Sequence, residues 1–391
     1  MAYPFKYHDY FDLDALLPEE IRMARDAVRD WVDREIVPTI EEHAMDATYS
    51  RDWMKQLGEM GCFGPSLSLD AGGQGLSETG YGVLMRELER GDTSVRSMAS
   101  VQGSLVMYPI SAFGSPMQKE KYLKALGAGD LIGCFGLTEP DHGSDPGGME
   151  TRIVQDGSGY RLSGSKMWIT NAPIADMAII WAKNEEGKIQ GLTLDMDRPG
   201  IRVETITGKW SLRASATGTI YLDDVAVTKD DFLPGARGLG YALKCLNKAR
   251  FGISWGAIGA AVDCYHTALS YALEREQFGK VIGSFQLIQK KLAEMITVIA
   301  QAQLMAFRIG QLADEGKVTS AQISMAKRSN VHMALQVARE ARQILGAMGI
   351  TSDYSVMRHM VNLETVITYE GTHDIHLLIT GQDVTGIAAY K

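Results

Sequence analysis

The sequence predicts an α+β multidomain protein with an N-terminal α-helical domain (1–129), a middle antiparallel β-barrel domain (130–238) and a C-terminal four-helix bundle domain (239–391). Two observations support this prediction. Apolar residues recur with a helical period in the first and last thirds of the chain, and with a period of two in between. No helical pattern separates the middle runs, so parallel crossover connections are not expected there.

The N-terminal domain begins with an amphipathic helix in "PEEIRMARDAVRDWVDREIV" (18–37). An apolar stripe runs along one face of this helix from Ile21 to Val32, and Pro38 ends it. Further helices are expected at 51–60, 78–91, 97–112 and 117–126. The run "SLSLDAGGQGLSETG" is so rich in Gly and Ser that it predicts a loop.

The middle domain consists of short runs rich in β-branched and aromatic residues. These runs are "LIGCFGLT", "GYRLSGSKMWIT", "MAIIWAK", "IQGLTLDM" and "GTIYLDDVAV". Turn sequences such as "DGSG" and "DRPG" separate them. The spacing is typical of an antiparallel sheet or barrel.

The C-terminal domain returns to long helical patterns at 239–274, 284–315, 318–348 and 373–387. Short loops, among them "REQFGKVIGS" and "DEGKV", join them. Short connections favour antiparallel packing of neighbouring helices, so we expect a bundle.

The composition excludes several functional classes. The 391 residues are 45% apolar and carry a net charge of −9, which argues against nucleic-acid binding as the main activity. Four cysteines form no CxxC pair, so neither a zinc site nor a disulfide framework is expected. No apolar run approaches the ~20 residues that span a bilayer, so no membrane interaction is expected. The N-terminus lacks signal- or transit-peptide character. We expect a bacterial cytoplasmic protein, or a mitochondrial matrix protein given without its transit peptide.

Two short motifs look functional but carry little specificity. "GARGLG" (235–240) matches neither the Walker nor the Rossmann spacing. "HDIH" (373–376) places two His three residues apart, yet no further ligand cluster accompanies it, and no metal is expected. Glu370, in "YEGTHDIH", lies just before a predicted helix. From periodicity alone it reads as an acid favoured by the helix dipole.

Several motifs taken together change that interpretation. "CFGLTEPDHGSD" (134–145), "SKMWITN" (165–171), "REQFGK" (275–280) and "YEGTHDIH" (369–376) occur in the order found in the acyl-CoA dehydrogenase family, which the chain resembles from about residue 10 to 391. "SVRSMASVQGSLVM" (94–107), "KWSLRASATG" (209–218) and "CLNKARFGISWG" (245–256) are similar to its glutaryl-CoA dehydrogenase branch.

The resemblance implies FAD as cofactor and Glu370 as the base that removes a proton alpha to a thioester. Such chemistry needs a carboxylate whose pKa is raised by apolar surroundings. The resemblance also implies flavin contacts from two segments: the strand that ends at Thr138, which lies near the flavin N5 atom, and "WIT" (168–170), in which Trp168 lies beside the flavin ring. Further implied cofactor contacts are Phe135, Gly136, Leu137, Gly143, Ser144, Ile169, Thr170, Thr372 and Asp374. On their residue types alone, Trp168 could be core and Thr372 or Asp374 a helix cap.

A second set of cofactor positions matches the part of the family that reaches the FAD of a neighbouring subunit. These residues are Arg275, Phe278, Gln286, Gln343 and Gly346. Arg275 would bind a phosphate as a fork. FAD shared between chains implies an oligomer, and the family resemblance implies a homotetramer built as a dimer of dimers.

The substrate set is also implied by the resemblance. Arg96 would bind the distal carboxylate of glutaryl-CoA, with Ser97 and Glu89 in the same network. Other positions implied to contact the substrate are Ser144, Leu246, Asn247, Arg250, Tyr369 and Gly371. On sequence alone, a surface ion pair of Arg96 with Glu89 or Asp92 remains an alternative.

The implied reaction oxidises glutaryl-CoA, decarboxylates the product to crotonyl-CoA and passes electrons to an electron-transfer flavoprotein. Four alternatives remain open: a non-decarboxylating glutaryl-CoA dehydrogenase, a short- or branched-chain acyl-CoA dehydrogenase, an acyl-CoA oxidase, and a non-catalytic helical scaffold that has lost FAD.

Overall fold

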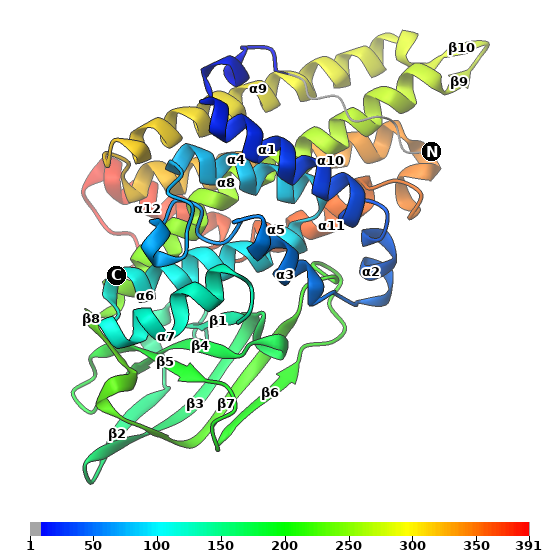
Figure 1. Cartoon of the computed structure of the whole chain (residues 1–391). Helices are drawn as coiled ribbons and strands as arrows, with labels where there is room; N and C mark the ends of the chain where they lie inside the picture. The colour runs from blue at the N-terminus through cyan, green and yellow to red at the C-terminus, as the bar shows by residue number, and fades with distance from the viewer. Residues whose placement is uncertain (1–8, 391) are drawn as a thin grey trace.

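The computed structural model describes residues 9–390 and has a helical, a β and a second helical region in the predicted order (Figure 1). Residues 1–8, which begin the predicted N-terminal domain, and residue 391 lie outside the described part of the chain. The sheet lies at one end of the molecule, and the helices of both terminal regions pack together above it (Figure 1).

The N-terminal region is helical throughout, and its helices lie close to the expected positions. They are α1 (Glu19–Trp31), α2 (Ile40–Asp46), α3 (Asp52–Glu59), α4 (Glu78–Gly91), α5 (Thr93–Ser100), α6 (Tyr108–Phe113) and α7 (Pro116–Gly127). Wide π-helical turns at Val32–Ile36 and Val101–Met107 extend α1 and join α5 to α6. The single helix expected at 97–112 is therefore a longer, composite one that begins at Thr93.

The middle region forms one sheet with the order β6-β7-β3-β2-β4-β5-β8, and β1 pairs with β4. Its strands are β1 (Gly133–Gly136), β2 (Arg152–Asp156), β3 (Gly159–Thr170), β4 (Met177–Lys183), β5 (Ile189–Asp195), β6 (Ile201–Thr205), β7 (Thr217–Val227) and β8 (Phe232–Arg237). Most pairs are antiparallel, as predicted, but β4 is parallel to both β1 and β2. The sheet is therefore mixed. Strand β3 runs antiparallel to β2 and returns the chain, so β4 runs parallel to β2 without a crossover helix.

The C-terminal region contains three long helices and two shorter ones. They are α8 (Leu239–Glu274), α9 (Gln286–Asp314), α10 (Ser320–Ile344), α11 (Val356–Val366) and α12 (His373–Thr385). A small hairpin of β9 (Glu276–Gln277) and β10 (Lys280–Val281) projects from the far end of α8 and α9 (Figure 1). In the described chain α9 alone has the length and composition of a membrane span, but half of its most apolar stretch is buried in the bundle, as in a core helix.

Helix α8 packs against α4 at very short range, because glycines line its contact face. A Cβ atom added at Gly256 would lie 2.0 Å from Glu89 Oε2, and one at Gly259 would lie 2.0 Å from the carbonyl oxygen of Arg86. Only a residue without a side chain fits at these positions. This close approach places the ionisable side chains of α4 directly beside α8.

Candidate active site

The candidate base, Glu370, lies in the short connection between α11 and α12. Its backbone is left-handed, with φ 54°, and Gly371 follows with φ 92°. A left-handed conformation costs a residue other than glycine about 1–3 kcal/mol, and such strain concentrates at functional sites. The surrounding structure must therefore hold this turn in place.

The Glu370 carboxyl group has the surroundings of a base that acts near neutral pH. Its Oε2 atom is buried and has no hydrogen-bond partner among residues 9–390. Burial raises the pKa of Glu370 to about 7, while the positive charges of Arg250, Arg96 and Lys327 act in the opposite direction. An unpartnered carboxylate oxygen with a raised pKa is free to accept a proton from a bound molecule.

Two buried cations hold the backbone on which Glu370 sits. Lys327 Nζ donates hydrogen bonds to the carbonyl oxygens of Tyr369 and Gly371, each at 3.0 Å. Arg250 Nε donates to the carbonyl oxygen of Glu370 at 2.7 Å. Three consecutive carbonyls are thus bound by side chains from α10 and α8. The expected contact of Arg250 with the substrate stays a prediction; its Nε is engaged with this turn, and its Nη1 donates to Asn247 Oδ1 at 3.2 Å.

Lys327 was not among the residues expected from the sequence. It is buried on α10, with 1% of its surface exposed. It lies on the same helical stripe as the buried Ile323 and Val331, four residues away on each side. A lysine on an otherwise apolar stripe is the signal that could have identified it, because a buried ammonium group requires partners.

Arg96 and Glu89 form a buried ion pair beside this turn. Arg96 Nε lies 2.5 Å from Glu89 Oε2, and the exposed fractions of the two residues are 1% and 0%. Arg96 Nη2 also donates to the Tyr369 hydroxyl at 2.5 Å, and Thr93 Oγ1 donates to Glu89 at 3.1 Å. The surface pair considered as an alternative is therefore wrong in its location, although Glu89 is indeed the partner of Arg96.

Glu89 and Arg96 meet across a helix boundary and not along one helix. Helix α4 ends at Gly91, and Asp92 caps α5 by accepting a hydrogen bond from the Ser94 amide at 2.6 Å. The other Asp92 oxygen accepts from Arg358 and from Asn362 Nδ2, both on α11. This buried cap fixes the angle at which α5 presents Arg96 and the buried Ser97.

Other predicted substrate contacts lie in different surroundings. Leu246 and Asn247 are partly buried on α8, one turn before Arg250, and Asn247 Nδ2 donates to Ser320 Oγ at 2.7 Å. Ser144 and Gly143 are exposed in the loop that follows β1.

The predicted flavin strand has features that fit a flat aromatic cofactor. Trp168 lies at an irregularity of β3, where the pairing with β7 shifts between Lys166 and Ile169, and its φ is 62°. This bulge turns the indole outward, so that 55% of Trp168 is exposed. Thr170 is partly buried next to the buried Ile169. An exposed indole ring on a strand of the sheet could stack against a flat flavin ring.

A buried ion pair supports the segment that carries the other predicted flavin contacts. Phe135, Gly136 and Leu137 are buried, and Thr138 is partly buried. Lys166 Nζ donates to the Leu137 carbonyl at 3.1 Å and to Glu139 at 2.8 Å. Burial lowers the pKa of Lys166 to about 8, and Glu139 opposes this shift. Neither Lys166 nor Glu139 was expected from the sequence.

The start of α12 combines a helix cap with a buried histidine. The Thr372 side chain caps the helix by accepting from the Ile375 amide at 3.2 Å, which is the structural role left open for it, while Asp374 is exposed. His376 is fully buried, and burial lowers its pKa to about 2. A Cβ at Gly371 would lie 3.0 Å from His376 Nε2. His376 therefore packs behind the Glu370 turn in its neutral form.

The second set of predicted cofactor residues lies apart from the first. Arg275 and Phe278 belong to the projecting β9–β10 hairpin, which lies far from the sheet in Figure 1. Phe278 is 94% exposed, and Arg275 is exposed as well. Gln286, Gln343 and Gly346 are exposed near the same end of the bundle, and Gln343 accepts a hydrogen bond from Lys291. One chain therefore does not bring the two sets together.

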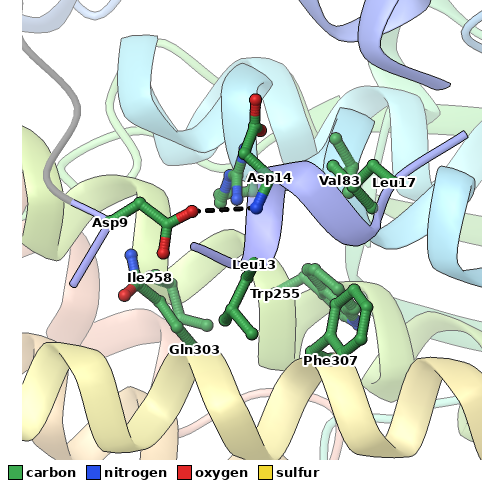
Figure 2. Close-up of a pocket in the computed structure, with 10 residues that line it drawn as sticks. Asp9, Leu13, Asp14, Leu17, Val83, Trp255, Ile258, Gln303 and Phe307 are labelled. Atoms are coloured by element: carbon green, nitrogen blue, oxygen red, sulfur yellow. Dashed lines mark hydrogen bonds between the residues drawn. The ribbon is translucent and has the colours of Figure 1, made fainter. Parts of the chain in front are cut away.

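A separate small hollow lies beneath the N-terminal segment, between α4, α8 and α9 (Figure 2). Asp9, Leu13 and Trp255 line it, and Asp9 accepts a hydrogen bond from the Asp14 amide at 2.8 Å. Its walls include none of the predicted site residues. Across the described chain no group of three or more His, Cys, Asp or Glu side chains is placed to hold a metal ion.

Comparison with known proteins gives consistent matches along the chain. Three family profiles match in order: the N-terminal (residues 18–130), middle (134–225) and C-terminal (236–385) domains of acyl-CoA dehydrogenase. The mitochondrial short-chain specific acyl-CoA dehydrogenase of Bos taurus is 34% identical over 372 residues, covering 93% of this chain and 89% of that protein.

Two solved structures are more similar. The crystal structure of glutaryl-CoA dehydrogenase from Mycobacterium smegmatis is 48% identical, with a TM-score of 0.96, and covers 98% of this chain and 100% of its own. A glutaryl-CoA dehydrogenase from the same organism in complex with FADH2 is 45% identical, with a TM-score of 0.95 over 97% and 98% of the two chains.

Proposed function

Because the chain belongs to the acyl-CoA dehydrogenase family and uses FAD, we propose that it oxidises glutaryl-CoA and decarboxylates the product to crotonyl-CoA. Glutaryl-CoA carries a second carboxylate at the far end of its acyl chain. The proposal therefore depends on what the protein offers to that carboxylate.

The proposal rests on the buried guanidinium group of Arg96, which lies beside Glu370 and is paired with Glu89 on one side. Arg250 and Lys327 share this site, and burial lowers the pKa of Lys327 to about 7. Arg96 Nη1 has no hydrogen-bond partner among the described residues, although Nε and Nη2 are both engaged. A buried guanidinium favours an anion at its open edge, and a distal carboxylate would supply that anion.

The chain's own residues would act as follows. Glu370 removes the proton from the carbon alpha to the thioester, and its raised pKa makes it a stronger base than an ordinary carboxylate. FAD, when bound, would supply the acceptor for the hydride of the beta carbon. Arg96 holds the distal carboxylate and so fixes where the alpha carbon lies relative to Glu370.

Decarboxylation needs no further redox partner. In the oxidised product, glutaconyl-CoA, the bond between the gamma carbon and the distal carboxylate breaks, and its electron pair enters the conjugated thioester. Carbon dioxide leaves, and protonation of the gamma carbon gives crotonyl-CoA. Glu370 holds the proton taken in the first step and is the group that can return it.

A second candidate substrate is an unsubstituted short-chain acyl-CoA such as butyryl-CoA. It is favoured by the Glu89 contact, since Glu89 already neutralises Arg96 inside the protein. In that case the pair would serve structure, as buried ion pairs often do. The open Nη1 edge of Arg96 leads us to prefer glutaryl-CoA.

We also propose an oligomer and an electron acceptor. The exposed set at the hairpin end of the bundle would complete the FAD site of a neighbouring subunit in a homotetramer, because the hairpin lies far from the sheet of its own chain. An electron-transfer flavoprotein is proposed as acceptor from family membership.

One experiment tests substrate and outcome together. Purified holoenzyme is mixed with glutaryl-CoA or butyryl-CoA and an artificial electron acceptor, and the products are identified by mass. Crotonyl-CoA with carbon dioxide from glutaryl-CoA supports the proposal, and glutaconyl-CoA would exclude decarboxylation. Turnover of butyryl-CoA in the absence of any glutaryl-CoA turnover would favour the second candidate. Peroxide formed without added acceptor would indicate an oxidase.

A further inference from the structure

Three consecutive peptide carbonyls around Glu370 are all bound by buried cationic side chains. Lys327 Nζ joins the carbonyls of Tyr369 and Gly371 at 3.0 Å each, and Arg250 binds the one between them. Successive carbonyls of a left-handed turn are not paired in a helix or sheet ladder. Lys327 and Arg250 supply the hydrogen-bond donors that a helix or sheet would otherwise provide to these carbonyls.

Lys327 has no other task in the described structure. Its two hydrogen bonds are both to this turn, and no carboxylate lies within ion-pair distance of it among residues 9–390. A lysine is expensive to bury without an ion-pair partner, so its position requires an explanation. A hydrophobic residue at this place on α10 would fill the core at lower cost.

We propose that Lys327 is a positioning residue for the base: by bridging the carbonyls on either side of Glu370, it holds this residue in the left-handed conformation that leaves its Oε2 unpartnered. Arg250 assists from the opposite helix. The inference deepens the proposed function and rests on Glu370 being the base.

The charge of Lys327 has a second effect, which can be measured separately from its hydrogen bonds. Burial lowers the pKa of Lys327 to about 7, and the Glu370 carboxylate opposes this shift; the protonated form of Lys327 in turn lowers the pKa of Glu370. Removing the charge therefore raises the pKa of Glu370 further. The ionisable groups around Glu370 are Arg250 on α8, Lys327 on α10, Arg96 on α5, Glu89 and Tyr81 on α4, His376 on α12 and the adjacent Tyr369.

Two variants separate the two effects. Lys327→Met removes both the hydrogen bonds and the charge, whereas Lys327→Gln removes the charge and keeps an amide donor. Lys317→Met is the matched control, because Lys317 is an exposed lysine in the loop after α9. FAD content by absorbance and the unfolding temperature are measured for each purified holoenzyme.

The assay measures proton removal by Glu370 separately from the oxidation that normally follows it. A 3-thia acyl-CoA has sulfur at the beta position and cannot lose a hydride there, so exchange of its alpha hydrogens in D2O reports proton removal without oxidation. The exchange rate is measured by mass spectrometry across pH. We expect Lys327→Met to lower the maximal rate by about 10- to 100-fold, because a misplacement of ~1 Å costs about that much. Lys327→Gln should lose less, and the control should match the natural protein.

The pH dependence distinguishes positioning from a merely structural role. Both Lys327 variants should shift the acid limb of exchange to higher pH by the same amount, whereas a general loss of folded enzyme lowers the rate at every pH without moving the limb. Natural rates and an unmoved limb in Lys327→Met would overturn the proposal, and so would losses that follow FAD content alone. If Lys327→Met does not fold, the same two criteria apply to Lys327→Gln. Absence of exchange in the natural holoenzyme would instead refute the assignment of Glu370 as the base.

Discussion

The glycine at position 256 should control substrate choice although it touches no substrate. An alanine there would place its Cβ 2.0 Å from Glu89 Oε2 and 3.1 Å from Arg96 Nε. The first distance is roughly 1.5 Å shorter than an ordinary contact of ~3.5 Å between nonbonded atoms. The Glu89 carboxylate must therefore move, and it is the group that holds Arg96 at 2.5 Å.

The Gly256→Ala substitution should have two effects, a loss of folding stability and a loss of transition-state binding for glutaryl-CoA, and each is measured separately. Overpacking a core by one methyl group destabilises a protein by about 1–3 kcal/mol, and separating a buried ion pair costs about 3–5 kcal/mol. If Arg96 then loses its hydrogen bond to the distal carboxylate, about 1.5–3 kcal/mol of transition-state binding is lost for glutaryl-CoA. This corresponds to a fall of about 10- to 150-fold in kcat/KM. Butyryl-CoA has no such carboxylate and should lose much less.

The assay compares Gly256→Ala with Gly240→Ala, which makes the same substitution in the same helix. No atom lies within 4 Å of a Cβ added at Gly240, so this control should be neutral or slightly stabilising. The ratio of kcat/KM for glutaryl-CoA to that for butyryl-CoA is measured alongside the unfolding temperature. An unchanged ratio in Gly256→Ala would refute the link between this glycine, Glu89 and Arg96, whatever happens to stability.

Three further outcomes follow from the site. Glu370→Gln should retain bound FAD but lower turnover by about 10²- to 10⁴-fold, since the amide cannot accept the proton, and full activity by steady-state assay would contradict its role. Arg96→Ala should weaken glutaryl-CoA binding far more than crotonyl-CoA binding in equilibrium titrations, and equal losses would remove the proposed carboxylate contact. In the natural holoenzyme kcat/KM should rise with pH through about 7, because Glu370 acts in its ionised form, whereas a midpoint near that of a free carboxyl would contradict the effect of burial.

Much of the fold follows from local pattern, and the exceptions have a common cause. The runs that predict strands at 159–170 and 177–183 match β3 and β4, and the pattern at 239–274 matches α8. By contrast, α11 was not predicted, because its buried face carries Arg358, His359 and Asn362. Arg358 and Asn362 are bound by Asp92, which lies more than 250 residues earlier. The buried face of α11 is polar and its partners are distant in sequence. The local sequence therefore lacks the apolar stripe by which a helix is predicted.

The candidate site was likewise predictable only in part. Motifs indicated Glu370, Arg96 and Trp168 as candidates, because a motif records which residues occur together, whereas periodicity records only which face is apolar. Lys327 and Gly256 lie in no such motif, and their importance appears only when α10 and α8 are packed against the Glu370 turn and α4. Lys327 binds the backbone carbonyl oxygens of two residues more than 40 positions away. Every residue type has such a carbonyl, so the residue types at the acceptor positions do not indicate this contact.

The charge of Arg96 links substrate choice to the strength of the base. Arg96 lowers the pKa of Glu370, so whatever neutralises Arg96 makes Glu370 a stronger base. A distal carboxylate bound at the open edge of Arg96 would do this, whereas a methyl-ended acyl chain would not. The distal carboxylate of a dicarboxylic substrate would thus promote oxidation of that substrate in two ways. It would raise the pKa of Glu370 by neutralising Arg96, and it would fix the position of the alpha carbon relative to Glu370. Glu89 limits the effect, because part of the Arg96 charge is already neutralised within the protein, and this is the physical reason why Glu89 and Arg96 must be considered as one unit.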